Sequence, residues 1–320
     1  MRWSCRRRCS RNDYICCILN GLKICGNLAF RKCATVKNMN IGIFNFNSIF
    51  GPRPINEERI NDFLSDFRTK RICFSRIQKN ALWQTKEGKN MLTLPFDDSV
   101  GAILKDQTGI SLKESSKGKY YQILGDKEVE RVRRFIDSYS DVVFLRDLLD
   151  SSVALSMNFE DDGETHTYVG ELEKKAKYDK NEEDLRKLAD MVDEFIGKTP
   201  LYANADLICA VPPSKTGDEN LPAGIVGKLT NFKGVDISKS IRWTSKTVSL
   251  KNAEGADKLE ILKHSGFEIV EGTDVKGKDI VLVDDLYMSG ITLQYVTMKL
   301  KEAGAGRVYG LCCVKSFGNK

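Results

Sequence analysis

The chain has 320 residues, of which 41% are apolar and 29% are charged, with 7 prolines and 25 glycines. That length allows one large domain or two ordinary ones, with a substantial core. The composition excludes a collagen-like chain, a largely disordered chain and a disulfide-stapled miniprotein. No stretch of 18 apolar residues occurs, so the sequence shows no obvious membrane span.

Positive charge and cysteine are concentrated at the start of the chain. Residues 1–38 hold nine of the 50 basic residues and one of the 44 acidic residues, so this segment carries +8 and the remainder carries −2. The same segment holds six of the ten cysteines. By its bulk charge, the remainder is not a basic nucleic-acid binder.

Three interpretations compete for residues 1–38. A secretory signal would combine the basic residues 6–8 with the apolar run 14–19, but Asn20 and the glycine after it break that run, and no small-residue cleavage site follows. A zinc module is disfavoured because the segment has no Cys-x-x-Cys pair. We favour a basic leader that is either disordered or not native, with a new pattern starting at Met39.

The cysteines of the remainder indicate a reducing compartment. They are Cys73, Cys209, Cys312 and Cys313, and the last two are neighbours inside an apolar run. Adjacent cysteines in such a run suit a reduced core and not a disulfide framework. We therefore expect a cytoplasmic protein.

Residues 39–139 are expected to form an α+β region of unknown role. The pattern indicates a strand near residues 41–46, a helix over 56–67 and a helix over 127–139. Residues 78–116 mix short apolar pieces with lysine and glycine. Neither a catalytic signature nor an internal repeat is evident, and only its position makes this region a candidate hood over a site in the second domain.

Residues 140–320 are predicted to form an α/β domain. Short continuous apolar runs predict strands buried on both faces, and apolar residues at helical spacing predict the helices. The expected strands are 207–211, 279–283 and 307–314, and the expected helices are 181–196 and 292–303. Strand, helix and strand in succession predict a right-handed βαβ unit in a parallel sheet.

The residues that suggest chemistry lie in segment 280–292. Asp284 and Asp285 come at the end of an apolar strand, and Ser289 and Gly290 follow in a short loop before a helix. Ligands of open α/β sheets bind beyond such strand ends. A helix N-terminus presents backbone N–H groups that suit a phosphate, and a glycine lets the backbone approach it. Two ionised acids can accept hydrogen bonds from neighbouring sugar hydroxyls and stabilise a cation developing beside them.

This segment resembles the ribose-phosphate signature of the type I phosphoribosyltransferases. Residues 150–318 are similar to the ComF-like branch of that superfamily, and the resemblance implies a parallel-sheet phosphoribosyltransferase-like core. Three features depart from the pattern: Met288 replaces a Ser or Thr, Leu250 replaces a Gln, and no Cys-x-x-Cys zinc ribbon precedes the domain. The upstream similarities are Gly170-Glu171-Leu172, Lys177-Tyr178, the loop 211–215, the basic stretch 241–247 and Gly266-Phe267.

The resemblance also implies roles for individual residues. The acids would hold the ribose, the loop after them would bind the 5′-phosphate, the loop 211–215 would face the pyrophosphate, and the basic stretch would close over the site and exclude water. The implied catalytic residues are Asp284, Asp285 and Lys246. The implied substrate-binding residues are Leu286, Tyr287, Met288, Ser289, Gly290, Ile291, Thr292, Pro213, Ser214, Lys215 and Arg242.

The function implied by the resemblance is that of an enzyme. It would bind 5-phosphoribosyl 1-pyrophosphate together with Mg²⁺, transfer the phosphoribosyl group to a nitrogen acceptor and release pyrophosphate. An alternative is a non-catalytic regulatory module that binds this sugar phosphate or a nucleotide, for example in DNA uptake and competence. A third hypothesis is that residues 39–139 bind a protein or a nucleic acid. The expected partners are the small-molecule substrate, an unknown acceptor and a second copy of the chain, with no membrane.

Overall fold

The computed structural model describes residues 52–213, 220–245, 253 and 255–317. The leader 1–38 and the strand expected near residues 41–46 lie outside the described residues. Within the described part, no helix is long and apolar enough to cross a membrane.

A seven-stranded sheet organises the described chain. In the order β1-β6-β7-β13-β12-β8-β9, the strands from β7 to β9 are parallel, and β1 and β6 are antiparallel additions at one edge. The predicted α/β class with a largely parallel sheet is confirmed. The strands are β1 (Arg71–Ile72), β6 (Val143–Leu145), β7 (Ser151–Met157), β13 (Val308–Lys315), β12 (Ile280–Tyr287), β8 (Leu207–Ala210) and β9 (Val235–Asp236).

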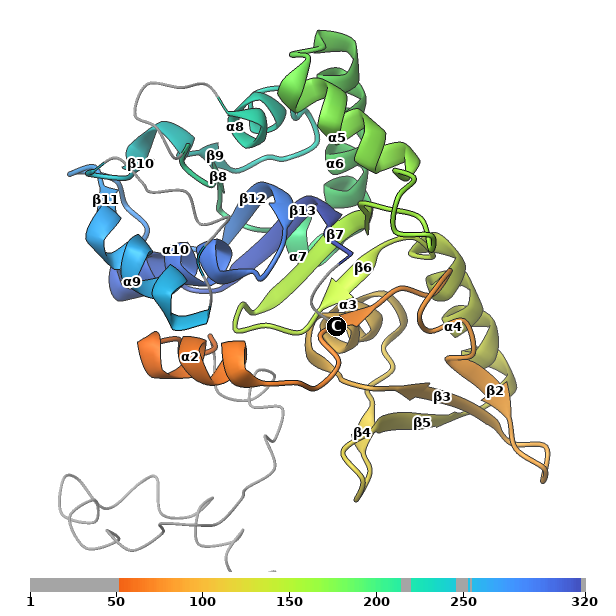
Figure 1. The fold of residues 1–320 in the computed structure, drawn as a ribbon. Helices are drawn as coiled ribbons and strands as arrows, with labels where there is room; N and C mark the ends of the chain where they lie inside the picture. Colours follow the sequence, from red (N-terminus) through yellow and green to blue (C-terminus); the bar gives the residue numbers. More distant parts are fainter. Residues whose placement is uncertain (1–51, 214–219, 246–252, 254, 318–320) are drawn as a thin grey trace, which may run out of the picture. The chain divides into compact units, whose positions relative to one another are not determined.

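Helices cover both faces of this sheet (Figure 1). Alternate residues of a strand point to opposite faces, so Val281 and Val283 face one core while Ile280 and Leu282 face the other. The first core is closed by α5 (Tyr168–Tyr178), α6 (Glu182–Lys198) and α8 (Leu221–Val226). The second is closed by α2 (Glu57–Ser65), α9 (Gly255–Ser265) and α10 (Ile291–Glu302).

The buried cysteines and both cores follow from this arrangement. Cys312 and Cys313 are adjacent on β13 and therefore lie in opposite cores, and each has a free thiol. Both cores also draw residues from either side of position 140, such as Ile72 and Val153 in the first. The described residues accordingly belong to one unit, which spans residues 45–320.

Most expected elements of the second half appear where the pattern predicts them. The helices expected at 181–196 and 292–303 are α6 and α10, and β12, α10 and β13 form the predicted strand–helix–strand unit. In the first half, the helices expected at 56–67 and 127–139 are α2 and α4 (Asp126–Ser138). One expected boundary was wrong: β12 does not end at residue 283, because Leu286 and Tyr287 continue the parallel pairing with β13.

A second, four-stranded sheet occupies the region that gave no clear pattern. It has the order β2-β3-β5-β4 and is antiparallel throughout. Its elements are β2 (Leu82–Gln84), β3 (Asn90–Leu94), α3 (Asp98–Thr108), β4 (Lys113–Glu114) and β5 (Tyr120–Leu124). Two short strands elsewhere, β10 (Ile241–Arg242) and β11 (Glu268–Ile269), pair with each other beside α9.

This second sheet contains an internal repeat, which corrects the expectation of none. A hairpin followed by a helix occurs twice, as β2-β3-α3 and β4-β5-α4, and the two copies are 30 residues apart from Leu82 and Leu112 onward. The register obeys a two-fold relation, since Leu92 pairs with its own equivalent, Gln122. The repeat is hard to find in the sequence because little more than the turns is shared: Thr85 to Lys89 in one copy matches Ser115 to Lys119 in the other.

Candidate functional site

The two acids and the proline loop meet at the carboxyl ends of the parallel strands of the large sheet. β8 and β12 are parallel neighbours with Ala210 opposite Val283, so the residues that follow these positions emerge together. They border a cavity of about 1530 Å³. Its walls also include residues of α5, α8, the segment 286–293 and the loop before α9. Among the expected site residues, the cavity is lined by Pro213, Asp284, Asp285, Leu286, Tyr287, Met288, Ser289, Gly290, Ile291 and Thr292.

Helix α5 brings a lysine onto the acids. Thr167 is the N-cap of this helix, and its Oγ1 accepts a hydrogen bond from the Gly170 backbone N–H at 3.0 Å. Gly170 lies against the Asn158 backbone, where a Cβ atom would overlap the carbonyl oxygen, so the helix can pack this closely only with glycine there. Two turns later, Lys177 Nζ lies 2.6 Å from Asp285 Oδ2 and 3.4 Å from Glu173 Oε1.

The charges in this cluster depend on one another. Burial, together with repulsion from Asp285, raises the pKa of Asp284 well above its usual value. Burial likewise raises the pKa of Glu173. For Lys177, burial alone would lower the pKa, but the attraction of Asp285 and Glu173 outweighs it and the pKa is raised. Lys177 is therefore a cation that allows the carboxyl groups of Glu173 and Asp285 to lie close together near the end of β12.

The loop after the acids has the geometry of an anion cradle. Gly290 has φ +73° and stands directly before α10, and an added Cβ would overlap the hydroxyl and ring of Tyr287. The first N–H groups of any helix lack partners within the helix, and at α10 the residues that carry them line the cavity. Met288 is 46% exposed at the same rim and offers no hydroxyl.

Tyr287 faces inward and supports this loop from below. Its side chain is buried, and its hydroxyl donates a hydrogen bond to Asp147 Oδ2 at 3.1 Å. Burial raises the pKa of Asp147 to about 6, although the Leu149 N–H, Tyr287 and Arg53 stabilise its charged form. The structure thus places Tyr287 between the loop and a buried acid from a distant part of the chain.

The proline loop is tied to the segment before α9. Trp243 is buried and its Nε1 donates to the Pro212 carbonyl oxygen at 3.1 Å. On the other side, Asn220 Nδ2 donates to the Val211 carbonyl oxygen at 2.7 Å. Ser214 and Lys215 themselves lie outside the described residues.

One expected loop residue does not line the cavity, and a second lies outside the described residues. Arg242 is exposed, its Nε donates to Glu268 Oε2 at 2.8 Å, and it does not line the cavity. Lys246 lies outside the described residues. Lys177 was noted in the sequence only as part of a Lys-Tyr similarity, because nothing in the pattern predicts that α5 crosses the sheet edge at the acids.

The cavity wall is rich in positive charge. It contains five lysines against three acids, and the acids are Glu182, Asp284 and Asp285. Such an excess suits a ligand with several negative charges. The lysines are Lys177, Lys180, Lys228, Lys239 and Lys258.

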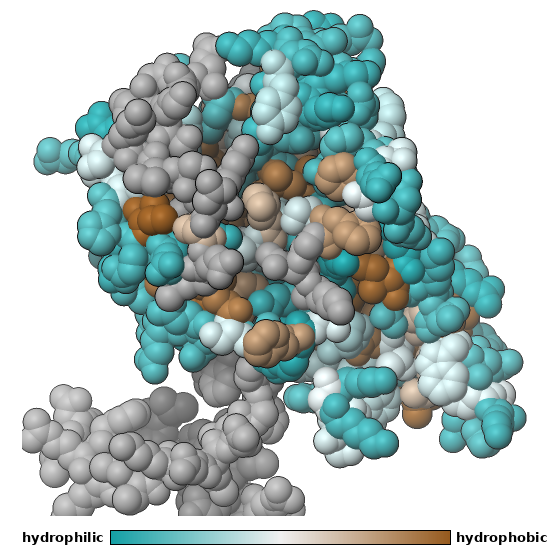
Figure 2. Space-filling model, in the orientation of Figure 1, coloured by the Kyte–Doolittle hydropathy of each residue, from teal (hydrophilic) through white to brown (hydrophobic). Residues whose placement is uncertain are grey.

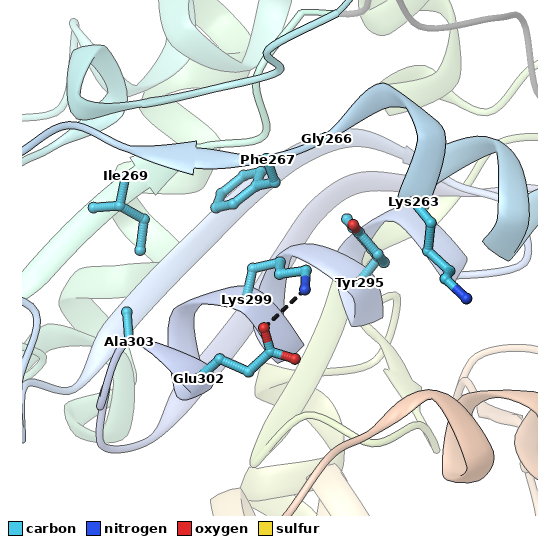
Figure 3. A pocket seen from close by; sticks show the side chains of 8 residues that line it. All are labelled: Lys263, Gly266, Phe267, Ile269, Tyr295, Lys299, Glu302 and Ala303. Carbon is cyan, nitrogen blue, oxygen red and sulfur yellow. Dashed lines mark hydrogen bonds and ion pairs between the residues drawn. The ribbon is translucent and has the colours of Figure 1, made fainter.

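A second, smaller hollow of about 460 Å³ lies on the flank of α10 (Figure 3). Phe267 and Tyr295 contribute rings to it, and its cations are paired: Lys299 with Glu302 at 2.8 Å and Lys263 with Glu57 at 3.0 Å. It contains none of the residues from the carboxyl edge of the sheet, and its paired charges give it no evident ligand.

Comparisons with known proteins give limited information. No family model matches the sequence, and no curated protein matches it. Among solved structures, the chain is similar to a hypoxanthine-guanine phosphoribosyltransferase from Bacillus anthracis, with a TM-score of 0.27 and 12% identity over 44% of this chain and 74% of that chain. It is also similar to a hypoxanthine phosphoribosyltransferase from Staphylococcus aureus, with a TM-score of 0.28 and 12% identity over 44% and 76%. The architecture described above rests on the strand order and register of this chain itself.

Proposed function

We propose that this protein is a phosphoribosyltransferase of the ComF-like kind that binds 5-phosphoribosyl 1-pyrophosphate. The observation that carries the proposal is the position of Asp284 and Asp285. They lie near the carboxyl end of β12, next to a glycine-containing helix N-terminus and opposite a proline loop, and all three border one cavity. Acids for vicinal hydroxyls and N–H groups for a phosphate are thereby arranged at opposite ends of a ribose 5-phosphate.

The reaction follows from the charges at each position. The bond between the anomeric carbon and the pyrophosphate oxygen breaks with its electron pair leaving on pyrophosphate. A nitrogen lone pair of the acceptor forms the new bond from the other side. Asp284 and Asp285 would stabilise the positive charge that develops on the sugar, and the lysines of the cavity wall would stabilise the leaving group. Closure over the cavity would exclude the water that competes with the acceptor.

Mg²⁺ would bind beside Asp284 and Asp285 as part of the substrate complex. The described residues contain no group of three or more His, Cys, Asp or Glu side chains that could hold a metal without help. Mg²⁺ is commonly bound through one or two carboxylates together with substrate phosphates and water, and Asp284 and Asp285 provide such oxygens. When bound, the ion would neutralise the charge of the pyrophosphate.

Calorimetric titration of the full chain with 5-phosphoribosyl 1-pyrophosphate and Mg²⁺ tests the proposal. We expect saturable binding by the wild type and a loss of at least about tenfold in Asp285→Asn, since an amide cannot replace an ionised acceptor. Asp257→Asn on the exposed side of α9 is the matched control and should bind as the wild type does. A folded wild-type chain that does not bind would overturn the proposal. If the wild type binds, pyrophosphate release is then screened with nucleobases and amines as acceptors.

A binding module without turnover is the second candidate. It is favoured by Met288, which is exposed at the cavity rim and provides no hydroxyl to the phosphate. It predicts the same calorimetric binding but no pyrophosphate release with any acceptor. Met288→Thr would then be expected to tighten binding, because it restores a hydroxyl at the rim.

A further inference from the structure

The sheet β2-β3-β5-β4, here called the hairpin sheet, has one face that no described element covers with a core. Trp83, Met91 and Ile123 are direct neighbours across three strands, so they share one face. Trp83 is 45% exposed and Ile123 is 50% exposed. The opposite face is buried, with Leu92 and Leu94 each 1% exposed in the first core.

The exposed face holds an indole in a fixed orientation. Trp83 Nε1 donates to Thr93 Oγ1 at 3.0 Å, which holds the ring over β3 and leaves much of it accessible. Tyr121 pairs with Thr93 from the next strand, and Lys113 pairs with Tyr121 from the edge strand. Aromatic, apolar and cationic side chains therefore lie side by side on one face of the hairpin sheet.

The hairpin sheet is also strongly basic. Residues 79–94 and 112–124 contain six lysines and two acids, a net charge of +4, whereas residues 39–320 together carry −2. All six lysines are exposed, and none of them forms an ion pair with a residue that the structure describes. They are Lys79, Lys86, Lys89, Lys113, Lys117 and Lys119.

The two-fold repeat distributes this charge to both ends of the surface. Because β3 and β5 are antiparallel, the turns at 85–89 and 115–119 lie at opposite ends of the hairpin sheet (Figure 1). Equivalent lysines, Lys89 and Lys119, therefore lie at opposite ends, with the aromatic residues between them. Figure 2 shows that the region of the hairpin sheet mixes hydrophilic and near-white side chains on the side in view.

We propose that the outward face of the hairpin sheet binds single-stranded nucleic acid. Exposed bases stack on aromatic rings, and a basic surface follows the phosphates, which is the combination found on this sheet. The bases of a duplex are already stacked and are reached through grooves, so exposed rings on the open face of a sheet suit an unpaired strand better. A second copy of the chain is disfavoured as the occupant, because two faces of +4 would repel each other.

Fluorescence anisotropy with a labelled oligothymidylate of about 12 nucleotides tests this with the full chain. We expect saturable binding, and about tenfold weaker binding in Trp83→Ala, with affinity largely restored in Trp83→Phe because a stacking ring remains. Lys89→Ala with Lys119→Ala should reduce the salt slope of log K by about 1.4, as expected when two phosphate contacts to a single strand are lost. Lys127→Ala on the exposed side of α4 is the matched control and should bind as the wild type does.

Several outcomes would overturn the proposal. Binding that is unchanged by both the Trp83 and the paired lysine variants would place the nucleic acid elsewhere, including on residues 1–38. Tighter binding of a duplex of the same length, or equal competition by polyglutamate, would show that the basic surface binds another kind of partner. Trp83-dependent self-association in sedimentation would assign the face to a second copy. Asp285→Asn should leave this binding unchanged, which separates it from the sugar-phosphate site.

Discussion

Lys177 Nζ lies 2.6 Å from Asp285 Oδ2, so a helix from one part of the chain neutralises an acid at the end of a strand more than 100 residues later. The same lysine lies 3.4 Å from the buried Glu173. Asp284 adjoins this pair and has a raised pKa because of its burial and the charge of Asp285. Lys177 thus contacts two of these three carboxyl groups, and a sugar that binds the aspartates must share Asp285 with it.

Lys177→Met should destabilise the fold at neutral pH. The substitution keeps the aliphatic length but removes the cation, so we expect a loss of about 2 kcal/mol in the free energy of unfolding, as for hydrogen bonds to charged groups. The loss should shrink at acidic pH, because burial raises the pKa of Glu173 and its protonation removes one unneutralised charge. Urea denaturation at pH 7 and pH 4.5 measures both values. Lys174→Met, from an exposed pair with Glu171 on the same helix, is the control and should cost less than about 0.5 kcal/mol.

Gly290→Ala should cost far more than an ordinary glycine substitution. A residue at φ +73° is strained in any case, and here the new methyl would also overlap the Tyr287 side chain, which is buried and cannot move aside. We expect a loss of about 3 kcal/mol or more, against about 1 kcal/mol at Gly88, where φ is +78° and the space is open. Thermal unfolding of both variants gives the comparison. Equal losses at the two glycines would show that Tyr287 does not fill the space beneath the loop.

Much of the large sheet could be predicted because its strands are buried on both faces. Continuous apolar runs such as residues 207–211 and 279–283 leave little ambiguity, and the helix after the acids is bounded by glycines at 290 and 304. The extension of β12 to Tyr287 was not predictable, because paired aspartates disfavour a strand locally and only the register with β13 keeps them in one.

The site was predicted where it is contiguous in sequence and missed where it depends on packing. Residues 284–292 form one continuous segment from the last part of β12 to the start of α10, so their grouping needs only local chemistry. Lys177 and Asp147 approach this segment from distant parts of the chain, and no spacing in the sequence indicates that they come near it. The hairpin repeat was missed for a related reason. Leu92 and Gln122 differ in chemistry, and only the strand register shows that they occupy equivalent positions.

Trp243→Phe should loosen the proline loop. The indole N–H donates to the Pro212 carbonyl oxygen in a buried position, so its loss leaves an acceptor without that partner and should cost about 1 kcal/mol of stability. Calorimetry should also show weaker binding of 5-phosphoribosyl 1-pyrophosphate, since this loop borders the cavity. Trp83→Phe is the matched control, because it removes an indole hydrogen bond that is exposed. A Trp243→Phe chain as stable as the wild type would argue against this anchor.

Asp147→Asn should change how stability depends on pH. Burial raises the pKa of Asp147 from 3.8 to about 6, so the folded state binds a proton more tightly than the unfolded chain does. The stability gained from that proton is fully present below about pH 4 and is lost as the pH rises through 6. Relative to the variant, which does not titrate, the wild type should therefore gain up to about 3 kcal/mol between pH 7 and pH 4.

Urea denaturation of the two proteins at pH 7, 6, 5 and 4 measures this difference. Asn remains able to accept the hydrogen bond from the Leu149 backbone N–H, which lies 3.0 Å from Asp147 Oδ1, so the local fold should persist. Asp137→Asn on the exposed side of α4 controls for the loss of one carboxylate far from the loop. A wild-type minus Asp147→Asn difference that stays flat from pH 7 to pH 4 would mean that Asp147 titrates normally. Its contact with Tyr287 would then support the loop equally at every pH in that range.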